Sequence, residues 1–401
     1  MHNFATPRNM TAAGLMLAAA LLFATPASAQ PVSITAPHIV LMDLKSQSVL
    51  FSRGAEEPLV AASLTKLMTL ATVFRELKSG KISLDTEFPV SVHAWRTGGA
   101  PSGTSTMFAA VKSNVRVEDL VIGAAALAGN DACIVLAEGL AGSEQAFVPR
   151  MNAYAAELGL VSARFESPTG LPPAADKISA RDLSMLAAVL IRDYPDYYKY
   201  FAVPEMTWSK VKQSNKNALL GSSLGVDGLG AGYAKESGYG IVVAAVQNGQ
   251  RLIAVVHGAK SEKDRTEDAR RLLEWGFRSF SDRLLFSAQS QIAYASVYGG
   301  AQGSVPLVGK GDIRILAQQG TNERFTAKVV YRGPLRAPIA KGAEVAKLRV
   351  FRGDQLALEV PLYAAEDVAT GSLLGRAMDS AYEFAAGLVR SAVRRVFTRN
   401  S

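Results

Sequence analysis

Residues 61–69 read Ala-Ala-Ser-Leu-Thr-Lys-Leu-Met-Thr, a short polar step that leads into an apolar run. Apolar side chains recur beyond this step at near-helical spacing, so we expect a helix that begins close to Ser63. Ser63 and Lys66 are three residues apart and would lie on the same face of that helix. A neutral Lys66 amine can take the hydroxyl proton of Ser63, which makes Ser63 a candidate nucleophile without any histidine.

The Ser-x-x-Lys spacing is by itself a weak signal. Residues 209–212, Ser-Lys-Val-Lys, repeat it without an apolar helical run behind them. About one or two chance matches are expected in a chain of this length. Taken alone, residues 63–66 equally fit a helix N-cap followed by a surface lysine. The rest of the chain has to decide between these interpretations.

The composition is that of a globular protein, because 49% of the 401 residues are hydrophobic and 19% are charged. This length allows two domains. The single cysteine, Cys133, excludes an intramolecular disulfide and lies in an apolar run, where we expect it to be buried. The four histidines are scattered without metal-ligand spacing, so we expect neither a metal site nor another cofactor.

Residues 1–29 have the features of a secretory signal peptide. Arg8 is an early basic residue, residues 12–24 are mostly apolar, and Ala27-Ser28-Ala29 is a typical cleavage site. The alternative is a membrane-spanning helix, but the apolar segment is too short for one. The formal charge of +8 becomes +7 without Arg8. An exported, mildly basic chain suits an anionic wall or membrane surface, and without a basic-aromatic cluster we expect no nucleic-acid partner.

The pattern of residues 30–283 predicts an α/β domain in which helices flank an antiparallel sheet. We expect strands at residues 39–43, 48–51, 241–246 and 252–256, the last two joined by a hairpin turn at Asn248-Gly249. Further helices are expected at residues 117–127, 131–140, 143–158, 179–191 and 264–277. Residues 91–106 are polar and rich in glycine, so we expect a loop there.

The hydrophobic pattern changes in the last part of the chain. Residues 284–369 contain short strand-like runs, at 305–308, 312–316, 325–331, 346–351 and 356–362, which predict a small all-β domain. Residues 370–401 carry arginines on one helical face and apolar side chains on the opposite face. This pattern predicts an amphipathic helix in a membrane interface. The alternatives are a helix that packs on the β domain or pairs in an oligomer.

Several stretches together resemble the D-alanyl-D-alanine carboxypeptidases, the low-molecular-mass penicillin-binding proteins that trim peptidoglycan stem peptides. They are residues 63–69, 129–133, 147–152, 168–171, 215–217, 227–229 and 272–277. The resemblance covers nearly all of the chain after the signal segment. It implies a β-lactamase/transpeptidase-like α/β domain, followed by the small β domain and the amphipathic tail.

The resemblance also implies the roles of individual residues. Ser63 would attack the peptide carbonyl between two terminal D-alanines and form an acyl-enzyme, with Lys66 as general base and Asn130 in contact with the substrate amide. The backbone N–H groups of Ser63 and Tyr233 would form the oxyanion hole. Arg265 would help to hold the terminal carboxylate. A stem peptide ending in D-Ala-D-Ala would be the substrate, and β-lactam antibiotics would be further ligands.

The chain departs from the family pattern at two motifs. Ala128 replaces the serine of Ser-x-Asn, which removes a proton relay to the leaving amine. Residues Gly230, Ala231 and Gly232 replace Lys-Thr-Gly in the substrate-binding motif. One lost charge-assisted contact costs about 1.5–3 kcal/mol, so we expect reduced activity. Lys235 and Lys216 are the two candidates for a replacement cation.

Two functions therefore remain open. The first is a slow serine D-alanyl-D-alanine carboxypeptidase, exported to the periplasm and peripherally bound to the inner membrane. The second is a catalytically inactive paralogue that binds peptidoglycan or a cell-wall partner. A β-lactamase ranks third, because it would need an efficient deacylating group and we do not expect Glu166 to be one.

Overall fold

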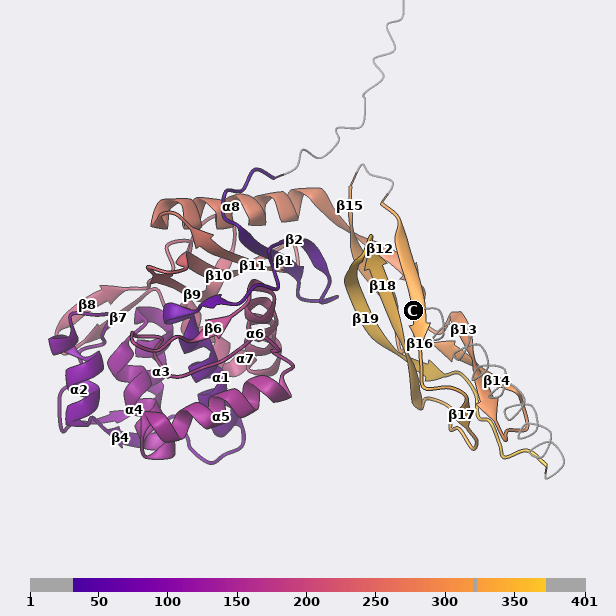
Figure 1. The fold of residues 1–401 in the computed structure, drawn as a ribbon, viewed down its shortest axis with the longest axis horizontal. Helices are drawn as coiled ribbons and strands as arrows, with labels where there is room; N and C mark the ends of the chain where they lie inside the picture. The colour runs from indigo at the N-terminus through magenta and orange to yellow at the C-terminus, as the bar shows by residue number, and fades with distance from the viewer. Residues whose placement is uncertain (1–31, 320–322, 373–401) are drawn as a thin grey trace, which may run out of the picture.

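The structure is a computed structural model that describes residues 32–319 and 323–372 (Figure 1). The expected signal segment, residues 1–29, lies outside the described residues, as do residues 373–401 of the expected C-terminal helix. Thr370, where we expected that helix to begin, instead forms a β-bridge to Gly300.

A five-stranded antiparallel sheet forms the centre of the first domain, with the strand order β2-β1-β11-β10-β9. The strands are β1 (His38–Asp43), β2 (Val49–Arg53), β9 (Val226–Ala234), β10 (Gly238–Gln247) and β11 (Gln250–Ala259). The expected hairpin is confirmed, and both of its turn residues, Asn248 and Gly249, have positive φ angles. Alternate residues of β10 and β11 enter two separate cores, one on each face of the sheet.

Helices cover both faces of this sheet, with α8 on one side and the main helical group on the other (Figure 1). The helices expected from periodicity are present: α1 (Thr65–Lys78), α3 (Val117–Leu127), α4 (Asn130–Ala141), α5 (Glu144–Glu157), α6 (Ala180–Asp193) and α8 (Glu262–Ser279). In α1 only Arg75 and Lys78 are not buried, as befits a helix inside a core. Ser63 lies just before α1, in the 3₁₀ turn η1 (Ala62–Leu64).

Several short elements differ from our expectation. The expected loop at 91–106 contains α2 (Val92–Gly98), which Ser91 caps by accepting a hydrogen bond from the Ala94 amide, and the turn η2 (Ala100–Ser102). Helices this short leave too little periodicity to detect. The second Ser-x-x-Lys match lies at a hairpin turn, where Ser209 and Lys210 have positive φ angles.

The remaining elements of this domain are small. They are β3 (Leu59–Val60), β4 (Glu87–Pro89), β5 (Asn114–Arg116), β6 (Lys177–Ile178), α7 (Pro195–Tyr198), η3 (Lys199–Ala202), β7 (Glu205–Trp208) and β8 (Val211–Ser214). Their pairs β3–β6, β4–β5 and β7–β8 are separate two-stranded ladders.

The second domain is all-β and has its own core (Figure 1). It begins with β12 (Phe280–Phe286), which follows α8 directly and pairs with β15 (Ile313–Gln318). A six-stranded sheet has the order β16-β18-β19-β14-β13-β17. Its strands are β13 (Gln291–Tyr298), β14 (Ser304–Val308), β16 (Phe325–Val330), β17 (Leu335–Arg336), β18 (Glu344–Arg352) and β19 (Gln355–Ala364). Arg352 joins the domains, since its guanidinium donates to the carbonyl oxygens of Val49 and Leu316.

Candidate active site

Ser63 and Lys66 are in direct contact. Lys66 Nζ lies 3.0 Å from Ser63 Oγ and 2.7 Å from the carbonyl oxygen of Thr169. The side chain is buried, with a residue exposure of 3%. Burial lowers the pKa of the Lys66 ammonium group to about 8. A lysine with this pKa can act as a general base on the neighbouring hydroxyl near neutral pH.

The turn at residues 167–170 supplies the carbonyl oxygen that binds Lys66. Gly170 has a φ of +75°, and a Cβ at this position would lie 1.9 Å from the carbonyl oxygen of Ala62. Only glycine therefore lets this turn press against η1. Asp176 ties the same segment to α1, since it accepts hydrogen bonds from the Thr65 hydroxyl and from both the amide and hydroxyl of Ser167.

Asn130 begins α4 directly behind a sharp turn. Ala128 ends α3 in the left-handed conformation, with a φ of 54°. The turn places Asn130 in the interior, where it is 2% exposed. Asn130 Nδ2 lies 2.9 Å from Thr104 Oγ1. Its Oδ1 atom is buried and has no hydrogen-bond partner within residues 32–319 and 323–372.

Strand β9 passes next to the nucleophile turn. A Cβ on Gly232 would lie 3.1 Å from the backbone nitrogen of Ser63, so this glycine allows the close approach. A Cβ on Gly230 would have room, with Leu67 Cδ2 at 3.8 Å. Tyr233, which follows Gly232, is 54% exposed, and its ring centroid lies 4.4 Å from that of Tyr239.

A small cavity of about 20 Å³ lies beside these groups. Its lining includes Ser63, Lys66, Ala128, Lys216, Gly230 and Ala231. Of the two candidate cations, the structure brings only Lys216 to this lining. Lys235 is exposed in the turn between β9 and β10.

Arg265, on α8, is not part of the cavity lining. It is 4% exposed and its Nη1 atom is 3.4 Å from the carbonyl oxygen of Gly232. Its Nη2 atom forms an ion pair of 2.7 Å with Glu262. Burial lowers the pKa of the guanidinium. Of the predicted site residues, Ser63, Lys66, Gly230 and Ala231 thus line one cavity, and Gly232 lies against the Ser63 backbone. Asn130, Tyr233 and Arg265 are not part of that lining.

Two further predictions concern Cys133 and Glu166. Cys133 is buried, as expected, and burial raises the pKa of its thiol to about 12. The Glu166 side chain accepts a hydrogen bond from the Ala175 amide at 2.9 Å, on its own loop.

Sequence reasoning missed the parts played by Thr104, Thr169 and Asp176. Thr169 acts through its carbonyl oxygen, which residue identity does not reveal. Thr104 stands in the polar segment expected as a loop at residues 91–106, but its contact with Asn130 crosses 26 residues. The Ser-Pro-Thr-Gly turn was the one visible signal for Thr169.

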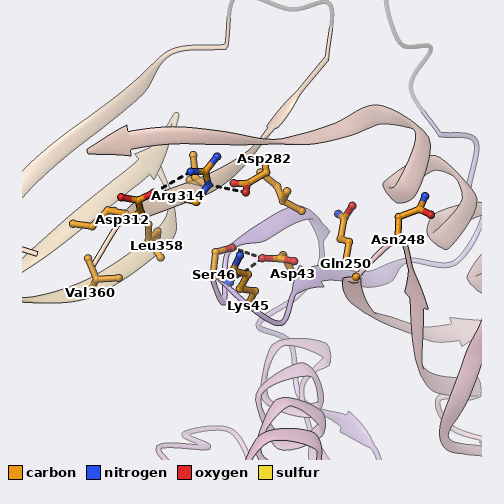
Figure 2. A pocket seen from close by; sticks show the side chains of 14 residues that line it. Asp43, Lys45, Ser46, Asn248, Gln250, Asp282, Asp312, Arg314, Leu358 and Val360 are labelled. Carbon is orange, nitrogen blue, oxygen red and sulfur yellow. Dashed lines mark hydrogen bonds and ion pairs between the residues drawn. The ribbon is translucent and has the colours of Figure 1, made fainter. Parts of the chain in front are cut away.

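A larger cavity of about 380 Å³ lies between the two domains, lined by Asp43 and other residues from the tips of the first-domain hairpins (Figure 2). Arg314 pairs there with Asp282 and Asp312, at 2.7 and 3.2 Å. Burial and the nearby charge of Asp282 raise the pKa of Asp43. None of the predicted catalytic residues lines this cavity. We therefore identify the smaller Ser63 cavity as the candidate active site.

Comparisons with known proteins agree with this geometry. The profile of the D-alanyl-D-alanine carboxypeptidase family matches residues 25–261, and that of the penicillin-binding protein 5 C-terminal domain matches residues 280–370. The D-alanyl-D-alanine carboxypeptidase DacC of Escherichia coli K12 is 36% identical over 369 residues, which are 91% of this chain and 92% of that protein. DacA of the same strain is 32% identical over 349 residues, which are 86% of this chain and 87% of that protein.

Solved structures agree in fold as well. Penicillin-binding protein 5 from Haemophilus influenzae superposes with a TM-score of 0.73 at 34% identity, covering 84% of this chain and 99% of that one. Penicillin-binding protein 6B from Escherichia coli gives a TM-score of 0.64 at 32% identity, covering 83% and 96% of the two chains. These similarities span both domains, so the chain belongs to the D-alanyl-D-alanine carboxypeptidase family of serine peptidases.

Proposed function

We propose that this protein is a serine D-alanyl-D-alanine carboxypeptidase that acts on peptidoglycan stem peptides through an acyl-enzyme on Ser63. The observation that carries the proposal is the contact of 3.0 Å between Lys66 Nζ and Ser63 Oγ at a buried lysine. Neutral Lys66 takes the hydroxyl proton while Ser63 Oγ attacks the carbonyl carbon between the two D-alanines. The C–N bond then breaks, the amine of D-alanine receives a proton, and water hydrolyses the ester.

The oxyanion of this reaction would be held by the backbone N–H groups of Ser63 and Tyr233. The close approach of Gly232 to Ser63 supports this assignment, because it brings β9 to the nucleophile. Gly230 and Ala231 would lie along the substrate without offering it a charge. Arg265 would act on the substrate carboxylate from its position beside the Gly232 carbonyl, which it contacts.

We propose that Lys216 supplies the cation that residue 230 lacks. It lines the Ser63 cavity together with Gly230, whereas Lys235, in the turn between β9 and β10, is not part of that lining. Lys216→Met should reduce the rate of Ser63 acylation about ten-fold, the cost of one charge-assisted contact. Lys235→Met is the matched control and should change the rate less than two-fold. Equal rates in the two variants would contradict the assignment.

The alternative is a catalytically inactive paralogue that binds peptidoglycan or a cell-wall partner. Gly230 and Ala128 favour it, because they remove a cation and a hydroxyl from the reacting region. Acylation separates the two functions, since a binding paralogue needs no nucleophile.

The deciding experiment is intact-mass detection of a penicilloyl adduct on the mature protein, with Ser63→Ala as control. We expect an adduct of one penicillin that depends on Ser63. Loss of D-alanine from a pentapeptide should then be measurable at low turnover. No adduct on folded protein after long incubation would favour the binding paralogue instead.

We also propose that the protein is exported to the periplasm and lies on the inner membrane through its C-terminal helix. The signal-like segment 1–29 and the arginines of residues 370–401 support this. Within residues 32–319 and 323–372, no helix has both the length and the apolar character needed to cross a bilayer. Removal of residues 373–401 should release the exported protein from sedimented membranes, and continued sedimentation would contradict the anchor.

A further inference from the structure

A chain of hydrogen bonds runs from Asn130 into the loop between η2 and β5. Asn130 Nδ2 lies 2.9 Å from Thr104 Oγ1, which lies 2.7 Å from Ser102 Oγ. The Ser102 hydroxyl in turn donates to the carbonyl oxygen of Gly99 at 2.7 Å. The chain therefore ends on a group that can only accept.

The far end fixes the direction of every link. Because the Ser102 hydroxyl gives its one proton to Gly99, the Thr104 hydroxyl must be the donor to Ser102. Thr104 Oγ1 then has only lone pairs to offer, so it accepts from Asn130. The amide nitrogen of Asn130 consequently faces Thr104, and its amide oxygen faces away.

The amide oxygen of Asn130 is left as a buried acceptor without a partner in the described part of the chain. A buried acceptor without a partner is energetically unfavourable, so it favours any donor that reaches it. Lys66 and a substrate peptide N–H are donors of the required kind. Resting on the proposed carboxypeptidase function, we infer that Thr104 is a positioning residue that holds Asn130 with its oxygen toward these donors.

The loop that carries Thr104 is itself anchored to α4. Asp131, which is fully buried, accepts hydrogen bonds from Thr106 Oγ1 at 2.6 Å and from the amides of Met107 and Ala109 at 2.9 and 3.0 Å. The backbone N–H of Asn130 donates to the Ser105 carbonyl at 2.8 Å. Thr104 is thus held in place before a substrate arrives, as positioning of a reacting group requires.

The test compares rates of Ser63 acylation by penicillin, measured by intact mass, in four variants. Thr104→Val keeps the shape but removes the hydroxyl, and we expect a loss of about ten-fold. Thr104→Ser keeps the hydroxyl and with it the chain of hydrogen bonds, so its acylation rate should be within two-fold of that of the parent protein. Ser102→Ala frees the Thr104 proton and should give an intermediate rate. Ser113→Ala, which removes an exposed hydroxyl bonded to the Ala110 carbonyl, is the control.

The inference fails if Thr104→Val acylates like the parent protein or if Thr104→Ser is as slow as Thr104→Val. If the parent protein is not acylated at all, the proposed function fails, and the positioning is then judged by NMR. The side-chain amide resonance of Asn130, assigned by its loss in Asn130→Asp, should shift in Thr104→Val and stay in place in Ser113→Ala. An unshifted resonance in Thr104→Val would overturn the inference.

Discussion

Lys66 combines two properties that conflict in most proteins. A lysine is rarely buried, because its charge is poorly solvated in the interior. Here the only contacts that stabilise the ammonium group directly are the Ser63 hydroxyl and the Thr169 carbonyl, among the described residues. Its burial is the feature that makes the amine available as a base.

The rate of Ser63 acylation should therefore depend on pH through Lys66. With a pKa lowered to about 8, about one tenth of the lysine is neutral at pH 7. The rate should rise with pH, reach half of its maximum near pH 8 and level off about one unit higher. The measurement is the acylation rate by intact mass between pH 6 and pH 10. A flat profile would exclude Lys66 as the base.

Placing a lysine at residue 230 itself should act on both binding and this profile. A Cβ on Gly230 meets only Leu67 Cδ2 at 3.8 Å, so the backbone position itself accepts a side chain in Gly230→Lys. Combined with Ala231→Thr and Ala128→Ser, it should raise turnover about 10- to 150-fold. The added positive charge should also move the midpoint of the pH profile below that of the parent protein, because it disfavours a charged Lys66. No gain in turnover would place the defect elsewhere in the site.

At the level of elements, the turn at residues 167–170 decides whether the site forms. Gly170→Ala would place a Cβ 1.9 Å from the Ala62 carbonyl oxygen at a φ of +75°. We expect a loss of at least about 3 kcal/mol in the free energy of unfolding and a strong loss of acylation. The measurements are urea unfolding and intact mass.

Gly159→Ala is the matched control for this variant. Gly159 has a φ of +73°, with nothing within 4 Å of its Cβ position. It should cost only the left-handed backbone penalty of about 1–2 kcal/mol and leave acylation unchanged. Equal costs for the two variants would mean that the contact with Ala62 is unimportant.

Elements with a long hydrophobic period could be predicted from the sequence, and the short ones could not. The hairpin at Asn248-Gly249 and the helices α3, α4 and α6 carry local signals, namely turn residues and apolar periodicity. The helix α2 is held in place by Ser91 and by packing on α4 through Gly98, which meets Asp131. Such tertiary support leaves no local trace. The Thr104–Asn130 contact escaped prediction for the same reason.

At the level of the whole molecule, Arg352 is the clearest link between the domains. Its guanidinium donates to the Val49 carbonyl in β2, to the Leu316 carbonyl in β15, and to Glu323. Burial lowers the pKa of this arginine, which nevertheless stays charged beside Glu323. The helical core and the β-domain core are separate, and only Phe280 and Leu316 among the described β-domain residues join the core under α8, so the link fixes the orientation of the domains more than their folding.

Arg352→Met should loosen the orientation of the β domain. We expect faster proteolysis between α8 and β12 and a larger radius of gyration by X-ray scattering, with Ser63 acylation within two-fold of the parent. Arg349 lies on the same strand as Arg352 and forms a more exposed ion pair with Glu359 of β19. Arg349→Met breaks that pair and should leave both measurements unchanged. An unaltered radius in Arg352→Met would contradict the linking role.

The order of the two folding units could be predicted from the sequence, but their connection could not. The runs that became β14, β16, β18 and β19 were visible as short apolar segments between glycines. The strand β12 was missed because it follows α8 without a turn signal and six of its seven residues are not buried. Arg352 reaches Val49 across 303 residues, a distance that no local pattern encodes.

The bare backbone at Gly230 also has a pharmacological consequence. Penicillins and cephalosporins carry a carboxylate that benefits from a cation next to the nucleophile, and residue 230 offers none. A boronic acid without a carboxylate forms its bond to Ser63 alone and forgoes nothing at this position. Uncharged electrophiles should therefore bind the parent protein and Gly230→Lys about equally, whereas carboxylate-bearing penicillins should react faster with Gly230→Lys.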